Sequence, residues 1–258
     1  MTKTLKVVIA ISLCLSLAYC ASSQAQLQKK QEKNPQYHYN RGTAYLNPAG
    51  GEVALDEAIK CFDRAIALDP KHYLSWNARG LAYSMKGDFK TAIQSLQKSL
   101  EINSAFSEAH NNLGTLYDAQ GMFSLAEVEY DKVLSDPNYA SKENPLYNLA
   151  QMYFRQGKND EALDFILRAL KINSRYAMAY NLKGKVFDKM ELPSEAITSY
   201  EQAVKLVPDD MNFQYDLALA LFNTGEKDRV DRILSLILGK TTDPQLRVKV
   251  AELKKKMK

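Results

Sequence analysis

The sequence has few of the residues that break helices or crosslink chains. Only 11 glycines and 8 prolines occur in 258 residues, which excludes a collagen-like or low-complexity chain and argues against a many-stranded sandwich. Three cysteines are too few for a disulfide framework. The 34 basic and 30 acidic residues leave a formal charge of +4, well short of the concentrated positive charge of a nucleic-acid-binding domain.

Long apolar runs are also scarce, and the one that stands out lies near the amino terminus. It covers the thirteen residues 7–19, after Lys3 and Lys6 and before a polar stretch. As a helix, a run of this length rises about 20 Å, which is short of the roughly 30 Å hydrocarbon core of a bilayer. The pattern therefore predicts a signal peptide over residues 1–19 and a protein that leaves the cytoplasm.

Two processing sites fit this signal. The segment LAYC at residues 17–20 resembles a bacterial lipobox with Cys20 as the lipidated residue, although Tyr19 stands where Gly, Ala or Ser is usual. The segment SQA that ends at Ala25 offers ordinary cleavage instead. The first site predicts a lipoprotein at the periplasmic face of the outer membrane, with residues 20–34 as a flexible tether. The second predicts a soluble periplasmic or secreted protein.

From residue 35 onwards the sequence repeats with a period near 34 residues. A small residue recurs with spacings of 38, 34, 36, 34 and 34, at Gly42, Gly80, Gly114, Ala150, Gly184 and Ala218. A second series has spacings of 34, 34, 36, 34 and 34, at Ala58, Ala92, Ala126, Ala162, Ala196 and Val230. Large apolar residues follow the first series by three positions and the second by four, the offsets of one helix face. Each repeat is therefore predicted to be two amphipathic helices, A and B, joined by a polar turn.

The repeat resembles the tetratricopeptide repeat. Trp76, Gly80, Tyr83 and Ala92 reproduce its W-x2-x-G-x2-Y…A signature, with Arg79 in the usual Leu position. The resemblance implies an all-α fold, a right-handed superhelical solenoid. Six repeats are predicted, at residues 35–72, 73–106, 107–142, 143–176, 177–210 and 211–244.

Close packing explains the small residues. Gly80 on helix A is predicted to face Ala92 on helix B, where a larger side chain would hold the two helices apart. After the sixth repeat, residues 245–258 are predicted to form a capping helix. The residues expected to cover the last repeat are Leu246, Val250 and Leu253.

No pattern in the sequence predicts catalysis. A phosphate-binding loop, a dinucleotide fingerprint, a zinc-protease helix and a serine elbow are all absent from it. His38 and His110 take the same position in repeats two apart, too distant to share a metal ion, and Cys61 beside Phe62 is expected in the core. We therefore expect a non-enzymatic protein with no cofactor, metal, nucleic acid or small-molecule substrate.

The remaining candidate is a partner-binding surface. In repeats of this type the A helices line the concave face, so we examine the positions three before and one after each small residue. Asn and Tyr there can pair with the backbone of a guest segment, and exposed apolar residues can offer pockets. The predicted contact residues are Tyr39, Asn77, Leu81, Asn111, Thr115, Tyr147, Gln151, Asn181, Lys185 and Tyr215, with Thr43 and Leu219 completing the two series.

Residues 109–157 resemble a particular group of repeat proteins. They read AHNNLGTLYDAQG and then VLSDPNYASKENPLYNLAQMYFRQG, with a lengthened junction between repeats. This is similar to the type IV pilus pilotin lipoproteins, the PilF, PilW and Tgl family. The resemblance implies an outer-membrane adaptor that helps secretin subunits assemble into the pilus pore. The alternative is a general envelope adaptor with the same fold and another guest, for example one that docks peptidoglycan enzymes.

Overall fold

The computed structural model describes residues 30–47 and 51–257. Every regular element in these residues is an α-helix, so the prediction of an all-α fold is confirmed. The helices are α2 (Pro35–Leu46), α3 (Leu55–Leu68), α4 (Tyr73–Met85), α5 (Phe89–Ile102), α6 (Ser107–Ala119), α7 (Phe123–Ser135), α8 (Glu143–Arg155), α9 (Asn159–Ile172), α10 (Ala177–Lys189), α11 (Pro193–Leu206), α12 (Met211–Asn223), α13 (Lys227–Lys240) and α14 (Pro244–Lys256).

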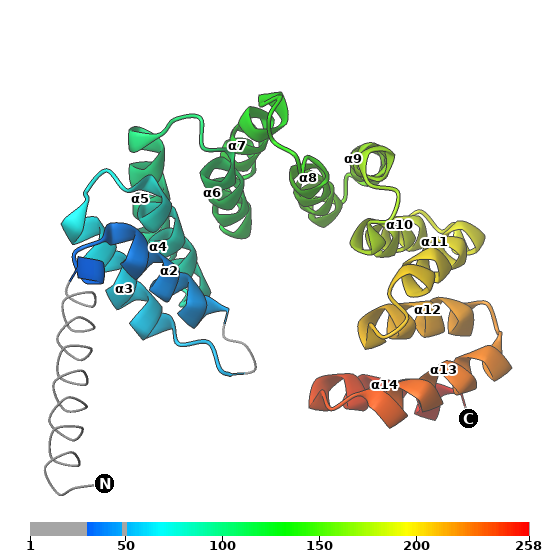
Figure 1. The fold of residues 1–258 in the computed structure, drawn as a ribbon. Helices are drawn as coiled ribbons and strands as arrows, with labels where there is room; N and C mark the ends of the chain where they lie inside the picture. Colours follow the sequence, from blue (N-terminus) through cyan, green and yellow to red (C-terminus); the bar gives the residue numbers. More distant parts are fainter. Residues whose placement is uncertain (1–29, 48–50, 258) are drawn as a thin grey trace, which may run out of the picture. The chain divides into compact units, whose positions relative to one another are not determined.

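The chain divides into two compact units between Leu116 and Tyr117, within α6. The even-numbered helices α2 to α12 take the place of the predicted A helices and the odd-numbered ones that of the B helices. Within unit one α2 packs on α3 and α4 on α5; within unit two α8 packs on α9, α10 on α11 and α12 on α13 (Figure 1).

The described region begins just before the first helix. Residues 30–34 belong to the predicted tether, and Asn34 caps α2 by accepting a hydrogen bond from the backbone N–H of Gln36 at 2.9 Å. The predicted signal peptide, both processing sites and Cys20 lie outside the described residues, and their roles stay predictions. In the part of the chain that the structure describes, no helix is long and apolar enough to cross a membrane.

Local sequence signals fix where several helices begin. Asp88 accepts a hydrogen bond from the backbone N–H of Thr91 at 3.1 Å at the start of α5. Asp210 accepts from the N–H groups of Asn212 and Phe213 at the start of α12. Such caps satisfy donors that the helix cannot pair internally. Proline stands in the first turn of α2, α11 and α14, where it needs no hydrogen-bond donor.

Small residues let the two helices of a repeat pack closely. A Cβ atom added to Gly80 of α4 would lie 2.8 Å from Leu96 Cγ and 3.1 Å from the carbonyl oxygen of Ala92, both in α5. Ala92 and Leu96 are fully buried. The prediction that Gly80 faces helix B at Ala92 is therefore confirmed.

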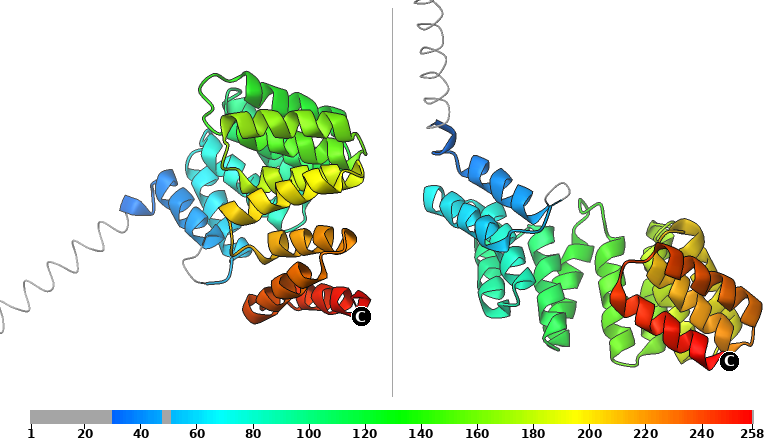
Figure 2. Two further views of the ribbon diagram at one scale, coloured as in Figure 1. Left: turned by 90° about the vertical axis from the view of Figure 1, so that its right-hand side faces the viewer. Right: turned by 90° about the horizontal axis from the view of Figure 1, so that it is seen from below.

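Each compact unit has its own hydrophobic core. In unit one, Ala58 and Phe62 of α3 pack with Ala78 and Ala82 of α4. In unit two, one cluster runs from α11 to α14, and α14 lies against α13 at the carboxyl end (Figure 2). The residues that α14 contributes are the predicted ones, Leu246, Val250 and Leu253. The predicted capping helix is confirmed.

Four repeats share one contact at the position four residues before the small residue of helix A. The side chain there reaches the backbone carbonyl six residues earlier, and an imidazole, an indole and an amide N–H all serve as the donor. The pairs are His38 with Glu32 at 2.9 Å, and Trp76 with Pro70, His110 with Ser104, and Gln214 with Pro208, each at 3.0 Å. The two histidines therefore anchor the start of their helices.

Five of the turns between helices A and B place one residue in the left-handed region of backbone conformation. Gly87, Gly121, Gly157 and Gly225 fill this position with φ from 73° to 85°, whereas the fifth repeat has Glu191 with φ 57°. A side chain in this conformation is sterically unfavourable, and glycine is not.

Replacing Glu191 by glycine is expected to stabilise the chain by up to about 1 kcal/mol, since the relief of strain outweighs the added flexibility of the unfolded chain. Urea unfolding measures the change. Gly157→Glu provides the reverse substitution at the same position of another repeat and should destabilise the chain. A Glu191→Gly variant less stable than the parent chain would contradict the expectation.

Candidate partner-binding surface

Asp216 of α12 connects two of the predicted contact residues in unit two. Its Oδ2 atom accepts a hydrogen bond from Asn181 Nδ2 at 2.9 Å and lies 3.0 Å from Lys185 Nζ, both of α10. Only 6% of Asn181 is exposed. A charged acceptor strengthens such a hydrogen bond, so Asp216 joins two successive A helices.

A neutral pair takes the same place in unit one. Asn112 Nδ2 of α6 donates to Asn77 Oδ1 of α4 at 3.1 Å. Asn112 and Asp216 each lie two residues before a small residue and 35 residues after their partners. The third predicted asparagine, Asn111, is half-buried, and its carbonyl accepts from the hydroxyl of Thr115 at 3.0 Å. Asn77 and Asn181 therefore link A helices.

The predicted tyrosines are held by packing. The ring of Tyr39 lies 5.6 Å from that of His72. Tyr147 is buried, and its hydroxyl oxygen accepts from Gln151 Nε2 at 2.9 Å. Burial raises the pKa of Tyr39, Tyr147 and Tyr215 because it disfavours the phenolate. These side chains are thus partly withdrawn from solvent.

The structure divides the predicted residues into two rows, which we call inner and outer. The inner row, three before the small residue, is buried or half-buried and contains Tyr39, Asn77, Asn111, Tyr147, Asn181 and Tyr215. The outer row, one after the small residue, is exposed or half-exposed and contains Thr43, Leu81, Thr115, Gln151, Lys185 and Leu219. The outer row is therefore the part of each A helix that a partner could reach first.

Sequence reasoning missed the residues one helical turn after the outer row. Arg155 is the last residue of α8 and forms an ion pair with Asp118, and Lys189 is the last residue of α10. Each lies four positions after an outer-row residue, hence on the same helix face. That spacing from Gln151 and Lys185 was the signal that could have found them.

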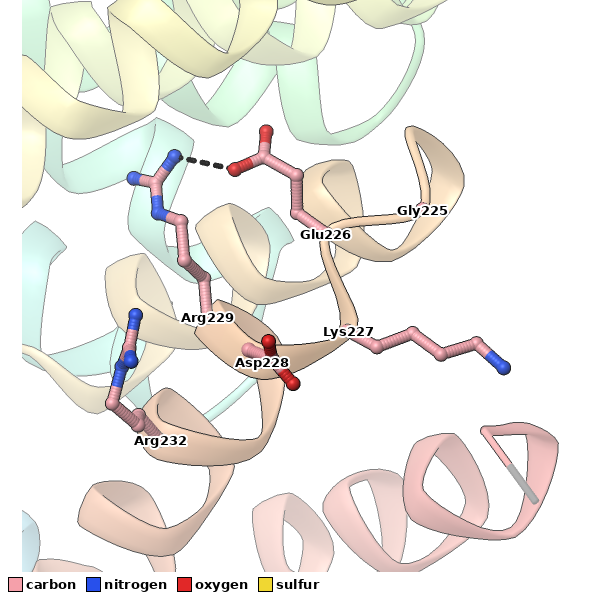
Figure 3. Close-up of a pocket in the computed structure, with 6 residues that line it drawn as sticks. All are labelled: Gly225, Glu226, Lys227, Asp228, Arg229 and Arg232. Atoms are coloured by element: carbon pink, nitrogen blue, oxygen red, sulfur yellow. Dashed lines mark hydrogen bonds and ion pairs between the residues drawn. The ribbon is translucent and has the colours of Figure 1, made fainter.

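A pocket of about 430 Å³ opens elsewhere, at the turn between α12 and α13 (Figure 3). Arg229 is already paired there, with Glu226 at 2.9 Å and Glu201 at 2.6 Å. No predicted contact residue lines the pocket, whose walls are Gly225, Glu226, Lys227, Asp228, Arg229 and Arg232. Across the described ranges, no three His, Cys, Asp or Glu side chains gather as metal ligands would.

Comparison with known families identifies the repeat. Family models described as tetratricopeptide repeat match residues 61–94 and 141–209, and one described as TPR repeat matches residues 194–225. The chain therefore contains tetratricopeptide repeats within residues 61–94 and 141–225, and the predicted solenoid class is confirmed. Repeats of this class generally form non-catalytic surfaces for binding other proteins.

Two solved structures are similar over nearly their whole length. PilW, described as a widely conserved type IV pilus biogenesis factor, has a TM-score of 0.73 and 16% identity, with 84% of this chain and 98% of PilW covered. The PilF protein of Pseudomonas aeruginosa has a TM-score of 0.69 and 15% identity, with 86% of this chain and 99% of PilF covered. At these identities the likeness is one of fold.

The curated relatives are longer proteins with other names. Anaphase-promoting complex subunit 3 of Schizosaccharomyces pombe is 26% identical over 161 residues, which are 62% of this chain and 24% of the relative. DnaJ homolog subfamily C member 3 of Gallus gallus is 28% identical over 193 residues, 70% of this chain and 38% of the relative. The chain thus spans less than two fifths of the length of these relatives.

Proposed function

We propose that the chain is a non-enzymatic scaffold that binds a protein partner through the outer row of its A helices. The division into two rows carries this proposal. The inner row is used by packing and by the hydrogen bonds between A helices, so its residues serve the fold. Outer-row residues also make internal contacts, such as those of Lys185 with Asp216 and of Gln151 with Tyr147, but they are more exposed than the inner row and vary in size, polarity and charge, as binding positions do.

The more specific proposal is an envelope adaptor of type IV pilus biogenesis that assists the assembly of secretin subunits. Its support is the fold shared with PilW and PilF and the lipobox-like segment that ends at Cys20. Acyl chains on Cys20 would contribute about 0.8 kcal/mol per buried methylene to membrane attachment. A tethered scaffold meets its partner at a raised effective concentration.

Deletion in the encoding organism tests this role. Secretin multimers in the outer-membrane fraction should be lost on deletion and restored by the parent gene. Cys20→Ala should restore them poorly, because the protein loses its anchor. Cys61→Ala is the matched control, since Cys61 is buried in α3 and its replacement should leave the anchor unchanged. Normal multimers in the deletion strain would refute the proposed role.

Mass spectrometry of the mature amino terminus tests the anchor separately. The proposal expects an acylated Cys20, whereas a chain that begins at an unmodified Gln26 would show cleavage after Ala25 and a protein without a lipid. Loss of secretin assembly together with a free Gln26 would support the scaffold and exclude the tether.

A further inference from the structure

The exposed positions of α8 and α10 in unit two differ in charge from those of the A helices in unit one and from those of α12, where Leu219 and Asn223 are uncharged. In unit one, the outer row and the residues one turn beyond it carry no charge: they are Thr43, Asn47, Leu81, Met85 and Thr115. In unit two, the same two positions of α8 and α10 carry three cations and an amide: Gln151, Arg155, Lys185 and Lys189. We call these four residues the basic surface. Because the repeats share one backbone plan, the contrast lies in the side chains alone.

The carboxylates near the basic surface lie deeper than its cations. Asp118 pairs with Arg155, and the side chain of Asp118 is 9% exposed against 50% for Arg155. Asp216 pairs with Lys185, with 21% against 43% exposed. In each of these two pairs, the carboxylate is therefore the more buried group and the cation the more exposed one. The remaining N–H donors of the guanidinium and the ammonium group face solvent.

A third carboxylate, Asp188, is exposed, but it is engaged by the protein. Its Oδ2 atom accepts a hydrogen bond from the hydroxyl of the buried Tyr200 at 2.7 Å. Next to it, Lys189 is exposed, and no carboxylate in the described parts of the chain lies within ion-pair distance of its ammonium group. A partner that approaches α8 and α10 thus meets cationic donors at three points.

Helix stability alone does not account for this arrangement. Arg155 and Lys189 end their helices, where a cation is favourable beside the last carbonyl groups. The A helices α6 and α12 end without a cation, in Ala119 and Asn223, whereas α4 has Lys86 at its C-cap. Lys185 lies a full turn before the end of α10, outside the range of that effect.

We infer that the basic surface of α8 and α10 binds a partner segment rich in aspartate and glutamate. The assignment rests on the proposed partner-binding role and names the chemistry of the partner. Exposed N–H donors over two neighbouring helices suit carboxylates spaced along an extended chain. Such binding weakens as ionic strength rises, because salt screens exposed charges.

Selection from a library of random twelve-residue peptides tests the assignment. The processed chain is immobilised and the bound peptides are sequenced. Acidic residues should be enriched, and the selected acidic peptides should lose about tenfold or more affinity for Lys185→Glu/Lys189→Glu. The matched control Lys255→Glu/Lys256→Glu changes the net charge equally on the exposed face of α14 and should retain affinity.

Lys189→Glu alone keeps the Lys185–Asp216 pair, so this variant replaces the double variant if the latter does not fold. We expect it to lose severalfold affinity for the acidic peptides. Peptides that depend on the outer row but show no acidic enrichment would overturn the acidic preference and leave the scaffold standing. If no substitution in the outer row changes the affinity of any selected peptide, the proposed binding surface is wrong as well. Equal loss in the control pair would show a net-charge effect and also overturn the assignment.

Discussion

Replacing Gly184 by alanine is expected to destabilise the chain by about 1 to 3 kcal/mol, the cost of overpacking a core. Alanine normally stabilises the interior of a helix relative to glycine by roughly 0.5 to 1 kcal/mol, so the expected sign is reversed. A Cβ atom at this position would lie 2.5 Å from Tyr200 Cε1 and 2.6 Å from Cδ1. Real Cβ atoms do not approach other atoms so closely.

The ring of Tyr200 cannot easily move aside. Tyr200 is 2% exposed, and its hydroxyl donates to Asp188. Burial raises the pKa of Tyr200, and the hydrogen bond to Asp188 raises it further, so the neutral hydroxyl stays in place as a donor. The added methyl group must therefore displace helix α10 from α11 or force the ring from its preferred rotamer.

Gly239 supplies the control for this substitution. It lies in α13, and an added Cβ atom would meet no atom within 4 Å. Gly239→Ala should stabilise the chain by up to about 1 kcal/mol. Thermal or urea unfolding should show changes in the free energy of unfolding with opposite signs for the two variants. A Gly184→Ala variant as stable as Gly239→Ala would show that the close approach of α10 and α11 is not required.

Much of the fold follows from the sequence because the same pattern of small and apolar residues recurs in each repeat. The recurrence of small residues such as Gly80 and Ala92 placed the two helices of a repeat face to face, and the apolar spacing in α14 predicted the cap. The first feature depends on contacts inside one repeat, and the second on contacts between α14 and the neighbouring helices. The division between Leu116 and Tyr117 has no comparable signal, because the repeat pattern continues across it.

The candidate surface was predicted only in part, for a related reason. The helical period places Asn181 and Lys185 on one face, but it does not show how far that face is turned toward the next A helix. The bond to Asp216 depends on this rotation, which packing in three dimensions decides. Sequence reasoning therefore grouped the inner and outer rows together, although one serves the fold and the other faces solvent.

Replacing Asp216 by alanine is expected to destabilise the chain by about 1 to 3 kcal/mol, the usual cost of leaving a buried polar group without a partner. Asn181 Nδ2 loses its acceptor at 2.9 Å, and Asn181 is too buried for water to replace it fully. Lys185 also loses its ion pair, but it is half-exposed, so this loss adds little. Urea unfolding measures the total change.

Asparagine at position 216 separates these two contributions. Asp216→Asn keeps a carbonyl acceptor for Asn181 and removes only the charge, so the expected loss is below about 1 kcal/mol. Asp231→Ala is the surface control: its carboxylate is exposed and lies 3.4 Å from Lys254, and its removal should change stability by less than about 0.5 kcal/mol. If Asp216→Ala were as mild as Asp231→Ala, the hydrogen bond between α10 and α12 would contribute nothing to stability. If Asp216→Asn were as damaging as Asp216→Ala, the negative charge would be the required feature, and the comparison with the neutral Asn77–Asn112 pair would fail.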